Sequence, residues 1–383
     1  MPGALPYWRL SGFYFCYFAL LGATAPFLAL YFDYLEFSPA RIGELIAITM
    51  LMRCVAPNVW GWLGDYTGRR LAIVRFGAVC TLISFAGIFI SKSYAWLALV
   101  MALHAFFWHA VLPQFEVITL AHLREQAAKY SQIRLWGSIG FIVAVVGLGQ
   151  LFEHLSLAAY PLAIVLIMAA ICISSFWVPD AQPRHRPEFA GQGRFIEQLK
   201  RPQILGFYLS VSLMQLSNGP YYTFLSVHLE ALGYARGAIG GFWALGVLAE
   251  IVLFMFMAQL LARFSLRRVL LASFLITAVR WVLLGNLADH VVVLIIAQLM
   301  HAATFGSFHA ASIHFVQRSF GDRQQGQGQA LYAALAGVGG ALGALYSGYS
   351  WSTLGSSWTF TLASVAVLAG AAVIATCLKE ERP

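Results

Sequence analysis

Charged residues are scarce in this sequence. Asp, Glu, Lys and Arg together make up 10% of its 383 residues, whereas a soluble domain contains about 25%. So few charges cannot cover a water-facing surface, and hydrophobic residues make up 60% of the chain. The composition therefore predicts an integral membrane protein. Cysteines are also few: all five stand singly, with no CxxC pair, so no disulfide framework is predicted.

The histidines do not follow the pattern of a metal-dependent enzyme. Ligand pairs on one helix are spaced three or four residues apart. The gaps here are longer: eight and five residues separate His301, His309 and His314, and five residues separate His104 and His109. No HExxH motif or acidic cluster completes a coordination sphere. We expect no metal, no catalytic residue and no enzymatic activity, which disfavours the rival reading of a membrane-embedded oxidase or acyltransferase.

Long apolar runs occupy most of the chain. A membrane-spanning helix needs about 20 mostly apolar residues. Residues 324–378 contain no charged residue and are too long for one span, so we break them within "YSGYSWSTLGSSW". The first run lacks a convincing cleavage site and is retained as a helix. Twelve spans are predicted, at about 10–32, 41–63, 71–90, 95–121, 133–154, 157–178, 203–229, 237–262, 267–287, 291–317, 325–349 and 355–378.

The distribution of basic residues predicts the orientation, because cytoplasmic loops are rich in Lys and Arg. With both termini in the cytoplasm, the outer loops hold only Arg41, Lys92 and Arg236. Arg53 and Arg280 lie within spans, and the other 19 of the 24 basic residues are cytoplasmic. The net charge of +8 is thus a sign of topology in an inner (cytoplasmic) membrane, and nucleic acid is not an expected partner.

The chain divides into two halves. The polar, basic segment 179–202 is predicted to be a cytoplasmic linker between an N-terminal six-helix bundle, 1–178, and a C-terminal one, 203–383. "LGDYTGRR" (63–70) follows the second helix of the first half, and "LARFSLRR" (261–268) follows the second helix of the other. Weak internal symmetry of this kind is typical of transporters built from two related units.

Glu250 is the only formally charged residue between Ala238 and Ala262. A charge at a helix centre costs about 2.5 to 3.5 kcal/mol on insertion scales, so such a residue usually has a partner or a function. Glu250 precedes Arg263 by 13 residues and Arg280 follows Arg268 by 12. Both therefore lie about 18 to 20 Å from the cytoplasmic turn. We predict that Arg280 holds Glu250 near the midplane, with His301 on the next helix.

"GWLGDYTGRR" resembles the signature of the major facilitator superfamily, Gly-x-Leu-x-Asp-x-x-Gly-Arg-Arg/Lys. In that family the motif is a cytoplasmic gate whose aspartate faces a neighbouring helix N-terminus, where a carboxylate is favoured. The alternative is that the arginines only fix topology and the glycine only closes a turn. The matching residues are Gly61, Leu63, Asp65, Gly68, Arg69 and Arg70.

The chain as a whole resembles the phenylpropionate permease family, relatives of lactose permease. "RLWGSIGF", "GVLAEIVLF", "AVRWVLLG" and "QLMHAATF" carry the resemblance. It implies that Glu116 of "PQFE", Arg134, which is 18 residues later, and Phe141, which is seven further on, bind substrate. It also matches Glu250, Arg280 and His301 to a helix 8 glutamate, a helix 9 arginine and a helix 10 histidine of the relative.

Two departures from lactose permease change what is expected. Thr304 stands where the relative has a proton-cycling glutamate and Gln298 where it has lysine, so we assign the proton to Glu250 with His301. Leu253 replaces an asparagine that bonds sugar hydroxyls in the relative. A pocket with fewer amide groups suits a less hydroxylated ligand, because buried polar partners select hydroxyls.

Other residues are open to two readings. Arg53 either binds a substrate carboxylate or pairs with Glu44 or Glu116. A kink at Pro220 is expected to mark a gate or site. Three aromatic residues are candidates for the pocket, although each fits a packing role better: Tyr221, Tyr222 and Trp243.

The sequence as a whole predicts an all-α secondary transporter with twelve transmembrane helices in two pseudo-symmetric bundles. We expect a proton-coupled symporter that imports a small organic solute, such as a phenylpropionate-like aromatic acid. It needs a small-molecule substrate, a proton as coupling ion and membrane lipid, has no cofactor, and works as a monomer. A sugar or nucleoside symporter, a drug exporter of the same fold and a ligand sensor are the rival readings.

Overall fold

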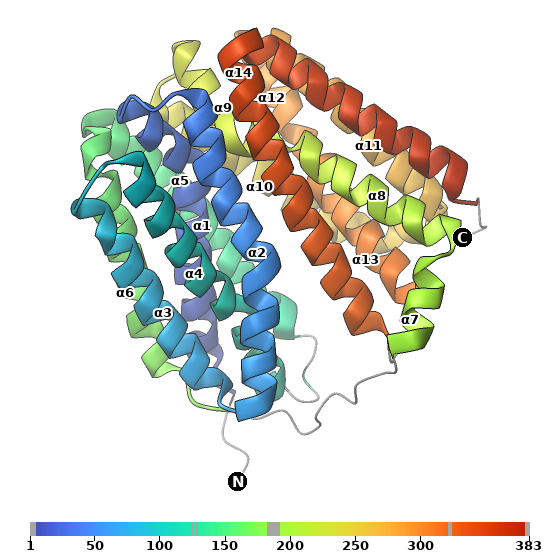
Figure 1. Cartoon of the computed structure of the whole chain (residues 1–383), viewed down its shortest axis with the longest axis horizontal. Coiled ribbons are helices and arrows are strands. Elements are labelled where there is room, and N and C mark those ends of the chain that lie inside the picture. Colours follow the sequence, from blue (N-terminus) through green and yellow to red (C-terminus); the bar gives the residue numbers. More distant parts are fainter. Residues whose placement is uncertain (1–4, 124–125, 127–128, 182–191, 321–323, 380–383) are drawn as a thin grey trace. The chain divides into compact units, whose positions relative to one another are not determined.

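The computed structural model describes residues 5–123, 126, 129–181, 192–320 and 324–379, and within them every regular element is a helix (Figure 1). In order, these are α1 (Tyr7–Tyr34), α2 (Pro39–Thr67), α3 (Arg70–Ala86), η1 (Gly87–Phe89), α4 (Tyr94–Leu123), α5 (Lys129–His154), η2 (Leu157–Ala159), α6 (Tyr160–Trp177), α7 (Gln192–Leu199), α8 (Pro202–Ser217), α9 (Gly219–Ala231), α10 (Arg236–Arg263), α11 (Leu266–Asn286), α12 (Val291–Leu299), the π-helical segment η3 (Ala302–Ser307), α13 (Phe308–Ser319) and α14 (Gln325–Cys377).

Each of the twelve predicted spans has a helical counterpart among the described residues. Within the described part of the chain, ten helical stretches are individually long and apolar enough to cross a bilayer. One of them, α14, consists of two helical arms that meet at Gly355, whose φ of 83° and ψ of 177° are open essentially to glycine alone. The two arms of α14 diverge at the top of Figure 1, in orange-red and dark red. The break predicted within residues 346–358 is confirmed.

The seventh span is interrupted, as the proline near its middle predicted. α8 ends at Ser217 and α9 begins at Gly219, with Asn218 between them and Pro220 in the first turn of α9. Proline is tolerated at that position because its missing N–H would have no intrahelical partner there. The discontinuity expected at Pro220 is thus a helix break at Asn218, two residues earlier along the chain.

The end of the predicted linker carries a short helix that its polar composition did not suggest. α7 has Phe195, Ile196 and Leu199 at helical spacing. The ring of Phe195 packs against that of Phe320, with 5.3 Å between centroids, which gives the helix an apolar contact. Residues 182–191 of the linker lie outside the described residues.

The described helices form two compact units. The first comprises residues 1–37, 48–187 and 235–241, and the second comprises residues 38–47, 188–234 and 242–383. In the first unit α1 packs along α5, and in the second α8 packs along the first arm of α14. The two pairs correspond in the repeat, because each consists of the first and fifth helices of its half.

Glycines let the paired helices approach closely. A Cβ at Gly140 of α5 would lie 2.1 Å from the carbonyl oxygen of Phe15 in α1. A Cβ at Gly339 of α14 would lie 2.6 Å from the carbonyl oxygen of Ser212 in α8. Small residues at such crossings are typical of helix packing in membranes, where dispersion contacts replace the hydrophobic effect.

A second shared contact supports the repeat. Near the start of α3, Arg75 Nη2 donates to the carbonyl oxygen of Val178, 3.2 Å away, just after α6. Near the start of α11, Arg267 Nη2 donates to the carbonyl oxygen of Ala375, 2.7 Å away, in the last turn of α14. In both halves an arginine on the third helix thus binds the carbonyl end of the sixth, where the helix dipole favours a cation.

Candidate functional site

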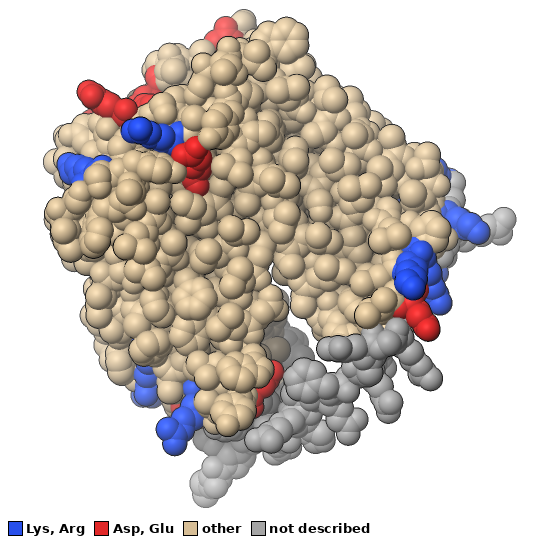
Figure 2. Space-filling view, in the orientation of Figure 1, with Lys and Arg blue, Asp and Glu red and all other residues tan. Residues whose placement is uncertain are grey.

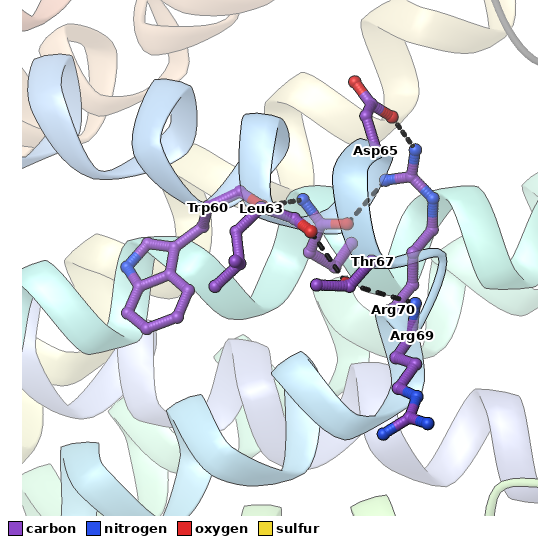
Figure 3. Close-up of polar contacts among 7 residues, drawn as sticks. Trp60, Leu63, Asp65, Thr67, Arg69 and Arg70 are labelled. Carbon is purple, nitrogen blue, oxygen red and sulfur yellow. Dashed lines mark hydrogen bonds and ion pairs between the residues drawn. The ribbon is translucent and has the colours of Figure 1, made fainter.

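The signature motif between α2 and α3 forms a compact polar network (Figure 3). Asp65 forms an ion pair with Arg70, the first residue of α3, whose Nη2 donates to Asp65 Oδ1. Gly68 has a φ of 67°, a left-handed conformation that favours glycine, and its amide closes the turn onto the carbonyl oxygen of Gly64 at 2.9 Å. The motif thus orders this turn. Its predicted role as a gate, with Asp65 facing a helix N-terminus, stays a prediction.

Gln114, in the middle of α4, connects the motif to the body of the first unit. Arg70 Nη1 donates to Gln114 Oε1 at 2.5 Å, and Gln114 Nε2 donates to the carbonyl oxygen of Trp60 at 3.2 Å. The Gln114 side chain is buried. Because it both accepts from the turn and donates to α2, it fixes the motif against α4. Sequence reasoning missed this role, since a lone glutamine in an apolar helix matches no motif.

Replacing Gln114 by leucine is therefore expected to destabilise the turn. The change leaves the carbonyl of Trp60 and one guanidinium N–H of Arg70 without this partner, which costs about 1–3 kcal/mol for a buried group. Thermal unfolding of the purified protein in detergent measures the loss. Asn58→Leu is the matched control, because the Asn58 side chain bonds locally, to the carbonyl oxygen of Cys54 on the same helix. Equal unfolding temperatures for the two variants would contradict the bridging role.

The first unit holds the predicted substrate residues Glu116 and Arg134 together. Glu116 lies on α4 and Arg134 on α5, and Arg134 Nε is 3.8 Å from Glu116 Oε1. About a third of each side chain is exposed, 36% for Glu116 and 32% for Arg134. The pair is thus accessible as well as held, and it can exchange partners with a charged ligand.

Aromatic rings of α1 also lie against Arg134. Its guanidinium carbon lies 3.9 Å from the ring centroid of Phe18 and 5.4 Å from that of Tyr14. The close approach of α1 to α5 at Gly140 brings these rings into contact, and Gly137 leaves room beside Phe18. Cation–π contacts of this kind contribute about 0.5–2 kcal/mol and orient the guanidinium. Glu116, Arg134 and these two rings are called the Glu116 cluster below.

Two further predicted residues lie in the same unit. Phe141 is buried on α5, and its backbone is in contact with Gly22 of α1. Arg53 is exposed on α2 and interacts electrostatically with Tyr17 and His109. These contacts fit binding and packing equally well, so both assignments stay predictions.

The second unit surrounds Arg280 with a polar and aromatic cluster. Arg280 lies on α11 and is fully buried. Its Nε donates to the carbonyl oxygen of Ala297 at 2.8 Å, and Nη2 donates to Gln298 Oε1 at 3.3 Å. The ring of Tyr221 lies under the guanidinium at 4.1 Å, and its hydroxyl donates to the same Gln298 oxygen at 3.0 Å. A residue just after the helix break at Asn218 thus becomes part of the cluster.

Glu250 and His301 extend this group, which is called the Glu250 cluster below. Glu250 Oε2 on α10 is 3.8 Å from His301 Nε2. The ring of His301 stacks on that of Tyr221, with 5.5 Å between centroids. The structure therefore brings together the three residues predicted to couple the proton, around Tyr221. Direct pairing of Glu250 with Arg280 stays a prediction.

His301 stands at an irregularity of its helix. Residues Ala302–Ser307 form a π-helical turn directly after it, and such turns are often found at functional sites. Gly306 lies against Glu250 and Leu253, and Gly246 lies against the His301 ring. The two glycines leave space for the carboxylate and the imidazole between α10 and the π-helical turn.

Three buried polar atoms of this cluster have no hydrogen-bond partner among the described residues. They are Arg280 Nη1, Gln298 Nε2 and His301 Nδ1. Each such atom costs about 1–3 kcal/mol when it is left unsatisfied. Two of the three, Arg280 Nη1 and Gln298 Nε2, are N–H donors, so they can bind an acceptor group.

Two residues of the Glu250 cluster have more contacts than the sequence predicts. Tyr221 was expected to be a packing residue, yet it contacts Arg280, Gln298 and His301. Gln298 was noted only as the replacement of a lysine, yet it receives hydrogen bonds from both Arg280 and Tyr221. The available signal for Tyr221 was "SNGP" (217–220), whose proline predicts a helix discontinuity directly before it.

Comparison with known proteins finds relatives that match nearly the whole chain. The chain is 27% identical over 370 residues to a probable 3-phenylpropionic acid transporter of Escherichia coli (strain K12), covering 94% of this chain and 95% of the relative. It is 26% identical over 379 residues to a maltose permease of Geobacillus stearothermophilus, covering 97% and 94%. Both relatives are described as transport proteins.

Solved structures match the fold. A crystal structure of the nucleoside transporter NupG matches with a TM-score of 0.85 at 17% identity, covering 98% of this chain and 99% of that one. A bacterial homologue of the lysosomal transporter Spinster matches with a TM-score of 0.75 at 13% identity, covering 97% of each chain. The all-α fold of the major facilitator type predicted from the sequence is thus confirmed.

The family match covers nearly all of the described chain, residues 7–362. The signature turn, the Glu116 cluster and the Glu250 cluster all fall within it. The chain is a multi-pass membrane protein that belongs to the MFS_1-like family of major facilitator transporters.

Proposed function

We propose that the protein is a proton-coupled symporter that imports a small aromatic acid of the phenylpropionate type across the inner membrane, with both termini in the cytoplasm. The observation that carries the proposal is the cluster of Glu250, His301 and Arg280, in which an ionisable pair lies beside a fully buried cation. Ionisable residues inside a membrane mark ion or substrate pathways, because each is costly to retain. The similarity to a probable 3-phenylpropionic acid transporter supports the substrate class.

In this proposal the two units divide the work. Arg134, stacked on Phe18 and held by Glu116, binds the substrate carboxylate, and the neighbouring rings suit an aromatic body. Glu250 takes up the proton, and protonation removes one charge from the cluster around Tyr221. A change of charge in a low-dielectric site biases one conformational state over another, which is the requirement for coupling.

A sugar or nucleoside symporter is the second candidate, favoured by the similarity to a maltose permease. Against it, Leu253 provides no hydrogen bond at the position where the resemblance to lactose permease implies an asparagine. An exporter of the same fold would use the same residues in the opposite direction. The fold does not identify the substrate or the direction of transport, so a transport assay is needed to distinguish these candidates.

Uptake of labelled 3-phenylpropionate into proteoliposomes tests the proposal. With acid outside, we expect accumulation above that of empty liposomes, abolished by a protonophore. Empty liposomes are essential, because a weak acid crosses bilayers unaided. Unlabelled maltose and uridine serve as competitors. Accumulation equal to the empty control would discard the acid, and competition by maltose or uridine would assign the second candidate instead.

A further inference from the structure

The second unit contains a cavity of about 300 Å³ away from the Glu250 cluster, at the ends of four helices. Its volume is at the lower limit of small-molecule pockets, about 300 Å³. Arg201 lies directly before α8, Arg267 in the first turn of α11, Arg318 in the last turn of α13 and Lys379 shortly after α14. Four separate chain segments thus each bring a cation to one cavity.

The charge of the cavity wall is one-sided. Among the described residues that line it there is no Asp or Glu, and His314 lies one helical turn before Arg318 on α13. Arg267 is held in place by its hydrogen bond to the carbonyl oxygen of Ala375. Figure 2 shows blue side chains gathered at the end of this unit where the C-terminus lies, alongside some red ones. The wall repels cations and favours an anion with several acceptor oxygens.

Part of the remaining wall is apolar. Phe264, Leu266 and Phe315 line the cavity beside the cations. A free inorganic anion gains nothing from such a surface, whereas the glycerol and upper acyl carbons of a lipid do. α8 also begins here without a side-chain cap, and the positive end of a helix dipole favours a phosphate.

We propose that this cavity binds the phosphodiester headgroup of an anionic lipid. In the predicted orientation the four helix ends lie at the cytoplasmic face, where basic pockets between helices meet anionic headgroups. The inference is independent of the transported substrate, because none of these residues belongs to the Glu250 cluster or the Glu116 cluster. Bound lipid would join the ends of α8, α11, α13 and α14 through one phosphate.

Titration of the detergent-solubilised full-length protein with dioctanoyl phosphatidylglycerol, followed by native mass spectrometry, tests the site. A basic residue near a membrane contributes about 1 kcal/mol toward an anionic lipid, or about fivefold in affinity. Arg318→Gln and Lys379→Gln are each expected to weaken binding about fivefold and the double variant about 25-fold. Arg263→Gln is the matched control, since Arg263 ends α10 without lining the cavity, and its affinity should stay within about twofold of wild type.

Further measurements separate the lipid from other ligands. Dioctanoyl phosphatidylcholine, which has no net charge, is expected to bind about tenfold more weakly or worse. Millimolar inorganic phosphate is expected not to displace the lipid. Equal binding of the two lipids, or full affinity in the double variant, would overturn the proposal. Displacement by inorganic phosphate with the same dependence on Arg318 and Lys379 would assign the cavity to a free anion instead.

Thermal unfolding without lipid checks that each variant is folded. Lys379 is exposed and lies beyond the end of α14, so Lys379→Gln is expected to fold. Its lipid affinity therefore tests the proposal even if the double variant does not fold.

Discussion

Replacing Glu250 by glutamine is expected to abolish uphill accumulation of substrate while leaving exchange intact. A symporter that moves one proton with each solute can accumulate about tenfold per unit of pH gradient, because one pH unit corresponds to about 1.4 kcal/mol. The Glu250 carboxylate, 3.8 Å from His301 Nε2, is the proposed proton carrier. The amide of glutamine has nearly the same shape and cannot take up the proton, so uptake driven by the pH gradient should fall to that of empty liposomes.

Two assays in proteoliposomes measure this effect. Net uptake under an imposed pH gradient gives the accumulation ratio, and counterflow at equal internal and external pH gives exchange. Glu197→Gln is the matched control, because Glu197 is an exposed carboxylate on α7, and it should behave as wild type. Wild-type accumulation by the Glu250 variant would remove the proton assignment, and loss of exchange as well would indicate a structural or substrate-binding role.

The second large effect is expected at Arg134. Its side chain is about one-third exposed, paired with Glu116 and stacked on Phe18, which is the arrangement expected of a group that receives a carboxylate. A hydrogen bond to a charged group is worth about 1.5–3 kcal/mol, so Arg134→Gln should lower kcat/KM for acid uptake by about 10- to 100-fold. Arg134→Lys keeps the charge but loses the planar fork, and partial activity is expected.

Initial rates of labelled 3-phenylpropionate uptake, measured over a range of concentrations, separate KM from kcat. Arg9→Gln removes the same charge from an exposed position in the first turn of α1 and should change neither parameter. A lowered unfolding temperature of purified Arg134→Gln would indicate damage to the bundle instead. Unchanged acid uptake would remove Arg134 from the substrate site.

Much of the architecture could be predicted from the sequence because a bilayer is a simple solvent. It requires about 20 apolar residues for each span, and it makes each retained charge costly. The twelve runs, the break in residues 346–358 and the kink at Pro220 follow from these rules and from the backbone limits of glycine and proline. Sequence spacing also placed Glu250 and Arg280 at one depth, and the structure places both in the cluster with His301.

The contacts within the two clusters depended on information that spacing does not contain. Phe18 and Tyr14 reach Arg134 only because α1 and α5 approach closely at Gly140. The carbonyl oxygen of Phe15 occupies the space that a side chain would fill there. Nothing in the apolar pattern of either helix says which face meets the other.

The class of the protein, its helices and the identity of the costly charges depend on local composition and on the bilayer, so they can be read from the residues alone. The neighbours of those charges depend on how the helices pack: Tyr221 under Arg280, Gln114 behind the signature turn, and four cations around one cavity. The physical reason is that side-chain partners are chosen by the rotation and separation of packed helices. These in turn depend on contacts between residues far apart in the chain.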